Sequence, residues 1–188
     1  MFDATPPLAR ARQDGRVSVE CAGLTGMVTL RGDIAAIGEP VADATGLSIP
    51  DTLGIVEDGG RALAWMSPDE LMLFCAYDEA EEIAATLTAA TAEDHALVAN
   101  VSDARAMFEL SGEEAALRET LAKLTPADLR PDAFPPGTIR RTRLAQVSGA
   151  IWLAEDGAMR VICFRSVADY VFSLLCHAAR PAAAVGHF

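Results

Sequence analysis

The stretch LMLFCAYDEAEEI (residues 71–83) has a counterpart 88 positions later in the chain, MRVICFRSVADYV (residues 159–171). Each begins with an apolar run of strand length that has a cysteine at its fifth position, and each continues into a helical pattern with acidic residues near its start. An apolar run followed by an amphipathic segment predicts a buried strand that leads into a helix. The same strand–helix unit is therefore expected twice.

Two shorter matches indicate that the whole chain is an internal duplication. VTLRGD (28–33) and FELSGE (108–113) lie 80 positions apart and share the order strand, glycine, acidic residue, helix. Trp65 and Trp152 lie 87 positions apart, and each opens a predicted hairpin. Self-similarity at a nearly constant spacing is typical of a repeated structural unit. We therefore expect two related halves, with the two tryptophans in equivalent hairpins.

The alternation of apolar and polar residues predicts the individual elements of each half. The first half is expected to contain strands at 16–22 and 26–32, a helix at 34–45, a hairpin with strands at 61–66 and 71–76 around the turn SPDE, a helix at 77–92 and a strand at 95–102. The second half is expected to contain strands at 105–112, 141–147, 150–154 and 159–164, a helix at 113–125 and a closing helix that starts at Ser166 or Asp169.

Capping residues predict where two of these helices begin and end. Asp33 stands at the N-cap position of the first helix, and Gly46 closes it. Pro40 is expected to kink that helix or to break it in two. In the second half, Ser111 with Glu114 three residues on has the spacing of a capping box.

Each half thus has the order β-α-β-β-α, which predicts an α+β fold: two lobes in a pseudo-repeat, with mostly antiparallel sheets and helices packed on one face. Four parts of the chain are expected. They are an N-terminal extension at 1–15, a first lobe at 16–102, a second lobe at 103–180 and a loose tail at 181–188 that begins with Pro181.

Composition and charge exclude several classes of protein. The net charge of −12 makes nucleic acid and an acidic membrane surface poor partners. No apolar run reaches the ~18 residues that a membrane span requires. The N-terminal MFDATPPLARARQDGR lacks the apolar core of a signal peptide, so a cytoplasmic location is expected.

The sequence carries no motif for catalysis, for a cofactor or for a metal. It has no G-x-G-x-x-G after a strand and no Walker loop, and its three histidines (His95, His177, His187) fit no metal-ligand spacing. No two cysteines form a C-x-x-C pair, and Cys75 and Cys163 lie within apolar strands, where we expect buried and reduced thiols. We therefore assign no catalytic, cofactor-binding or metal-binding residue to this chain.

An unusual group of basic residues follows the helix predicted at 113–125. Arg140, Arg141 and Arg143 fall within four positions of a chain that is otherwise acidic, and RPDAFPPG (130–137) precedes them. One interpretation is an exposed strand whose charged side chains discourage aggregation. The other is a partner-docking surface in which Phe134 is held outward or across a groove as an anchor and the three arginines contact acidic groups.

Four stretches together resemble one known family: LAWMSPDELMLF (63–74), NVSDARAMFELSG (100–112), DLRPDAFPPGTIRRTRLAQVSGAIW (128–152) and FRSVADYVFSLLCHA (164–178). They are similar to the gamma subunits of heterotetrameric sarcosine oxidase. The hairpin pattern W-x-x-P-D-E (65–70) is also similar to the folate-binding, aminomethyltransferase-like domains, whose fold these subunits share.

The resemblance implies a cytoplasmic complex with alpha, beta and delta subunits that demethylates sarcosine oxidatively. The products are glycine and hydrogen peroxide, and the one-carbon unit passes to tetrahydrofolate. FAD, FMN, NAD and zinc are implied in the partner subunits, and no catalytic residue is carried over to this chain. The alternative is an autonomous module that binds folate or transfers a one-carbon unit.

Overall fold

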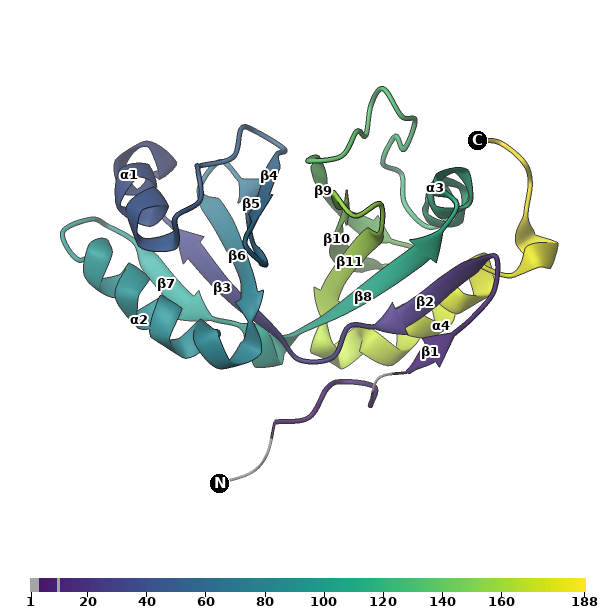
Figure 1. Cartoon of the computed structure of the whole chain (residues 1–188), viewed down its shortest axis with the longest axis horizontal. Coiled ribbons are helices and arrows are strands. Elements are labelled where there is room, and N and C mark those ends of the chain that lie inside the picture. Colours follow the sequence, from purple (N-terminus) through teal and green to yellow (C-terminus); the bar gives the residue numbers. More distant parts are fainter. Residues whose placement is uncertain (1–3, 10) are drawn as a thin grey trace. The chain divides into compact units, whose positions relative to one another are not determined.

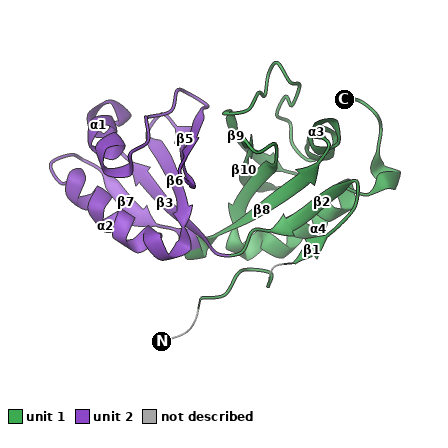
Figure 2. Ribbon diagram, viewed as in Figure 1, with its two compact units in different colours: residues 1–23, 103–188 green, residues 24–102 purple. Residues whose placement is uncertain are grey.

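The computed structural model describes residues 4–9 and 11–188, which form two compact units (Figure 2). One unit is continuous and contains residues 24–102, and the other joins the chain up to Gly23 with residues 103–188. Each unit has an antiparallel sheet with helices packed against one of its faces (Figure 1). The prediction of an α+β fold with antiparallel sheets is confirmed.

The unit of residues 24–102 is built on a five-stranded sheet with the order β4-β5-β6-β3-β7. Its elements are β3 (Thr25–Arg31), α1 (Ile34–Thr45), β4 (Ile55–Asp58), β5 (Arg61–Ser67), β6 (Glu70–Ala76), the 3₁₀ turn η1 (Tyr77–Glu79), α2 (Ala80–Ala90) and β7 (Leu97–Asn100). The apolar sides of α1 and α2 pack on this sheet and close its core.

The other unit is built on a six-stranded sheet with the order β1-β2-β8-β11-β10-β9. Its elements are β1 (Arg12–Gln13), β2 (Val17–Cys21), η2 (Ser102–Ala104, whose first residue ends the other unit), β8 (Arg105–Gly112), α3 (Glu114–Ala122), β9 (Ile139–Leu144), β10 (Val147–Leu153), β11 (Met159–Phe164), η3 (Arg165–Val167), α4 (Ala168–Ala178) and η4 (Pro181–Ala183). Helices α3 and α4 cover its core.

The structure confirms the internal duplication. The strand order β4-β5-β6-β3 of one unit is repeated as β9-β10-β11-β8 in the other. The register is repeated as well, because Gly26 lies opposite Cys75 in one sheet and Ala106 lies opposite Cys163 in the other. Each four-stranded repeat has one strand more than the predicted β-α-β-β-α order. In the first half the additional strand is β4, which was not predicted because two of its four residues are Glu57 and Asp58.

The two tryptophans lie in equivalent hairpins but not at equivalent positions. Trp65 lies opposite Leu71, whereas Trp152 lies opposite Arg160. The residue of the first repeat that is equivalent to Arg160 is Met72, and Met72 lies opposite Ala64. Trp152 therefore corresponds to Ala64, and a shift of one residue turns a side chain to the other face of a sheet.

Strand β2 does not belong to the lobe in which the sequence placed it. It pairs with β8, so that Val17 lies opposite Gly112, and β7 takes the matching position beside β3. The expected boundary at residue 16 is therefore corrected: the first lobe begins at residue 24, and the chain before it completes the second sheet. Part of the expected N-terminal extension joins that sheet too, as β1, with Arg12 opposite Glu20.

The two central cysteines are buried as predicted, in the cores beneath the helices. Burial raises the pKa of the Cys75 thiol, and it raises the pKa of Cys163 to about 12. Because the thiolate is the reactive form, both side chains act as small apolar core residues at neutral pH.

The helix ends agree with the sequence in the first half and differ in the second. The carboxylate of Asp33 accepts the backbone N–H of Ala35, and Gly46 ends α1 in the left-handed conformation. Helix α1 runs through Pro40 without being broken in two. Ser111 is not an N-cap, because it belongs to β8, where it lies opposite Ser18.

The C-terminal tail, expected to be loose, is held by a buried carboxylate of α3. Glu119 accepts the backbone N–H groups of Val185 and Gly186, and Phe188 packs against the core. The hydrogen bond from Val185 is the main cause of a lowered pKa for Glu119. A lowered pKa means that the carboxylate is charged at neutral pH, so the contact is lost only in acid, as the pH falls through that pKa.

We expect Glu119→Ala to release the tail at neutral pH. Amide hydrogen exchange of Val185 and Gly186 should become at least ~10-fold faster, because both N–H groups lose their acceptor. Glu113→Ala, at an exposed position just before the same helix, is the control and should leave both rates unchanged. Equal protection of the tail in Glu119→Ala and the native chain would contradict the structure.

Candidate interaction surface at the α3–β9 loop

The loop between α3 and β9, residues 123–138, contains the stretch RPDAFPPG (130–137) that precedes the basic group noted in the sequence (Figure 1). It contains no helix, and connections of this length without one are uncommon in compact domains unless they bind something or are disordered. This loop is ordered by contacts with α3 on one side and with β9 on the other.

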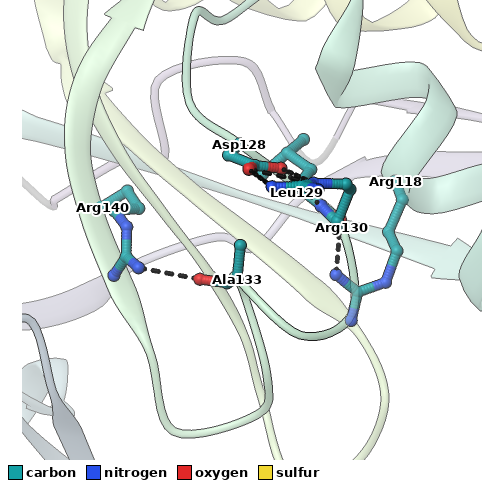
Figure 3. Close-up of polar contacts among 6 residues, drawn as sticks. All are labelled: Arg118, Asp128, Leu129, Arg130, Ala133 and Arg140. Carbon is teal, nitrogen blue, oxygen red and sulfur yellow. Dashed lines mark hydrogen bonds and ion pairs between the residues drawn. The ribbon is translucent and has the colours of Figure 1, made fainter.

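Arg118 fixes the loop from the side of α3. Its side chain is only 2% exposed, and its Nη1 donates to the carbonyl oxygens of Leu129 (2.7 Å) and Phe134 (3.0 Å). Its Nε and Nη2 contact the carboxylate of Glu114 one turn earlier, at 2.8 and 2.6 Å. The guanidinium thus has partners on the helix and at two points of the loop, as a buried charge requires. Figure 3 shows its hydrogen bond to the carbonyl of Leu129.

Phe134 does not point outward. Its side chain is fully buried in the core beneath α3 and α4, and Leu129 is buried beside it in the same cluster. The backbone N–H groups of Ala133 and Phe134 both donate to the carbonyl of Arg130, which closes a turn at this point. The expectation of an exposed aromatic anchor is therefore wrong, because the Pro-rich segment curls over its own phenylalanine.

Arg140 holds the loop from the side of β9. Its Nη2 donates to the carbonyl of Ala133 (2.9 Å), and its guanidinium carbon lies 5.7 Å from the centre of the Phe134 ring. In Figure 3 Arg140 and Arg118 approach the loop from a strand and from a helix, with the loop between them. Arg140 is half-buried and acts mainly as a support of the loop.

The outer part of the loop carries an exposed ion pair. Arg130 contacts the carboxylate of Asp128 through Nε and Nη2, with a shortest distance of 2.6 Å (Figure 3). Hydrogen bonds from Arg130 lower the pKa of Asp128 to about 2. Both side chains are about half exposed or more, so the pair adds little to stability and mainly fixes the direction of the Arg130 side chain.

Arg141 and Arg143 are exposed on β9, which is the last strand of its sheet. They lie two residues apart and so share one face, while Arg140 is on the other. In the register of the strand pair they lie opposite Ala150 and Ser148 of β10. The three arginines of the predicted docking site are therefore not one patch: one supports the loop and two face outward.

Arg118 is the functional residue of this segment that the sequence analysis missed. Glu114 and Arg118 are four residues apart, a spacing that predicts an ordinary surface pair on a helix. A signal was present in the composition of α3, since Arg118 lies between Leu117 and Leu121, which belong to the apolar face. An arginine placed there has to find acceptors inside the protein.

The assembled groups can recognise negative charge but are not arranged for bond-making chemistry. Guanidinium groups bind carboxylates through paired hydrogen bonds and do not act as general acids or bases at neutral pH. Within the part of the chain that the structure describes, no group of three or more His, Cys, Asp or Glu residues is placed to hold a metal ion. In residues 4–9 and 11–188, no helix has the length and apolar character needed to span a bilayer.

Comparison with known proteins identifies relatives over most of the chain. The model of the sarcosine oxidase gamma subunit family matches residues 31–181. A sarcosine oxidase subunit gamma from Corynebacterium sp. (strain P-1) is 31% identical over 140 residues, which are 73% of this chain and 67% of that protein. One from Arthrobacter sp. is 34% identical over 124 residues, which are 65% of this chain and 59% of that protein.

Solved structures give the same result for the fold. A chain of the heterotetrameric sarcosine oxidase from Corynebacterium sp. U-96, in complex with pyrrole 2-carboxylate, matches 93% of this chain and 90% of its own length, with a TM-score of 0.80 and 27% identity. The glycine cleavage system aminomethyltransferase T from Bartonella henselae matches 81% of this chain and 43% of its own length, with a TM-score of 0.56. At 16% identity, this second likeness shows the fold alone.

We expect Phe134→Ala to destabilise the isolated chain. Removing a fully buried phenylalanine leaves a cavity and typically costs ~4 kcal/mol. The free energy of unfolding can be followed for this unit by the fluorescence of Trp152 in urea, in a Trp65→Phe background. Pro135→Ala, at the exposed neighbouring position, is the control. A Phe134→Ala chain as stable as this control would mean that the ring is not in the core.

A second pair of substitutions separates the buried arginine from the exposed one. Arg118→Met should lower the free energy of unfolding by about 3 kcal/mol, because two buried carbonyls lose their donor. Arg130→Met makes the same chemical change on the outside of the loop, where loss of the exposed pair should leave the free energy of unfolding nearly unchanged. Similar losses in the two variants, measured by the same urea titration, would refute the assigned roles.

Proposed function

This chain belongs to the sarcosine oxidase gamma subunit family, and we propose that it is the gamma subunit of a heterotetrameric sarcosine oxidase and is not catalytic by itself. The observation that carries the proposal is the agreement over nearly the whole chain with a chain of such a heterotetramer, at a TM-score of 0.80. Agreement at both units favours a role that uses the whole fold, such as filling a defined position in an assembly.

In this proposal the partners are the alpha, beta and delta subunits of a cytoplasmic complex. The complex demethylates sarcosine to glycine and passes the one-carbon unit to tetrahydrofolate, and the partner subunits hold FAD, FMN, NAD and zinc. The non-catalytic role of this chain is supported by the structural use of its buried charged residues. Arg118 and Glu119 bind backbone groups of their own chain and so hold its irregular segments in place.

The alternative is an autonomous module that binds folate or transfers a one-carbon unit. Its support is the likeness to aminomethyltransferase T, which covers 43% of that enzyme and concerns the fold alone. A shared fold hosts many functions, so a function has to be argued from the residues of a site. We therefore keep the subunit as the proposed function.

Co-expression tests the proposal directly. The four subunits from one genome should purify as a complex in which this chain is present in equal amount, and that complex should oxidise sarcosine. The isolated chain should be colourless and inactive. Flavin retained by the isolated chain, or oxygen consumed by it with sarcosine, would contradict the non-catalytic role, and tight binding of tetrahydrofolate in isothermal titration would favour the alternative.

A further inference from the structure

We propose that the outer side of the α3–β9 loop, together with the exposed arginines of β9, docks on an acidic surface of a partner protein. This inference rests on the proposed function, because it names the surface that such a subunit would use. We call this surface the basic crest and define it by its exposed members: Asp128, Arg130, Pro131, Asp132, Pro135, Pro136, Arg141 and Arg143.

The sign of the charge distinguishes the basic crest from the rest of the chain. Its exposed members include three arginines and two aspartates, a net charge of +1, while the whole chain has −12. The remainder of the chain therefore carries −13. An acidic partner surface is repelled by most of this protein and attracted by the basic crest, so the field orients the encounter. A basic partner surface would instead be repelled by the basic crest and attracted by the rest of the chain.

The α3–β9 loop is already ordered in the absence of a partner. Arg118 and Arg140 bind three of its carbonyl groups, and the buried Leu129 and Phe134 tie its inner side to the core. Binding to a surface that is already ordered avoids most of the entropy loss that a flexible loop suffers. These internal contacts involve carbonyl groups and buried side chains, and they fix the position of the exposed residues of the loop.

The chemistry of the exposed groups also fits an acidic partner surface. Three exposed prolines, Pro131, Pro135 and Pro136, fix the backbone and have no N–H to be left unpaired in an interface. Asp128 occupies Nε and Nη2 of Arg130 and so fixes the direction of its guanidinium, which leaves the fork of Arg143 to meet a partner carboxylate. Arginine forks fit carboxylates, and arginine is enriched among the residues that dominate binding energy. The partner chemistry that fits is a protein surface rich in Asp and Glu.

Charge reversal in the assembled system tests this inference. The native chain and two variants, Arg130→Glu and Arg143→Glu, are each mixed with the purified complex of the other three subunits, and the association rate is measured at low and at high salt. Arg180→Glu, which makes the same change at an exposed residue after α4, is the matched control. All four chains should have the native unfolding transition, since these side chains are exposed.

We expect each variant of the basic crest to associate at least ~10-fold more slowly than the native chain at low salt. The difference should shrink in ~0.5 M salt, because screening removes the steering. The control should stay within about twofold of the native rate. Replacing Pro135 and Pro136 together by Gly should weaken the complex at unchanged charge, because the crest then has to be ordered on binding.

Three outcomes would overturn the inference. If the variants associate at the rate of Arg180→Glu, docking takes place elsewhere on the chain, although the subunit role stands. If charge reversal speeds association, the facing surface is basic and the assigned partner chemistry is wrong. If the native chain does not associate with the other subunits at all, the proposed function fails together with this inference.

Discussion

The constraint on which the architecture depends is that a central strand of a sheet needs a partner at each edge. Strand β8 has β11 on one side, and its other partner is β2, from the start of the chain. The pairing of Cys21 with Phe108 therefore closes a loop that contains the whole unit of residues 24–102. In that unit the N–H of Val101 donates to the carbonyl of Met27, so its two ends lie together. Once the unit of residues 24–102 has folded, β2 and β8 are connected by only a few ordered residues. The entropic cost of bringing the two strands together is then about 2 kcal/mol lower than for an unfolded connection.

Helix α3 imposes a second requirement, because two consecutive charged residues, Arg118 and Glu119, are both buried. Each needs partners of opposite polarity, and irregular backbone supplies them, since its carbonyl and N–H groups are not used up by helix or sheet. Arg118 takes carbonyls of the α3–β9 loop, and Glu119 takes N–H groups of the C-terminal tail. One helix thereby orders two segments that have little regular structure of their own. Replacing the irregular segments would remove the backbone acceptors of the Arg118 Nη1 and the backbone donors of the Glu119 carboxylate.

The sequence predicted what depends on local pattern and failed where the outcome depends on distant partners. The repeats, the buried Cys75 and Cys163 and the cap at Asp33 follow from periodicity and from neighbouring residues. The partner of β2 could not be predicted, because an alternating strand has the same pattern whichever strand it pairs with. Phe134 was placed outside because the prolines around it favour an extended segment, whereas in the structure its ring is buried and its carbonyl accepts from Arg118, a donor on another element. Prolines restrict the backbone of such a segment but do not decide which side of it faces the core.

The same distinction applies to the arginines of the α3–β9 region, which looked alike in the sequence. Arg118 and Arg140 lie against backbone carbonyls, so their charge is used within the fold. Arg130 and Arg143 are exposed to solvent, where a charge contributes little to stability and can attract or repel an approaching protein. The inner pair makes the outer pair effective: a cation on a flexible loop samples many directions, whereas one on a fixed loop presents a constant field. Exposure, and not the presence of an arginine, thus separates the residues that build this surface from those that can recognise a partner.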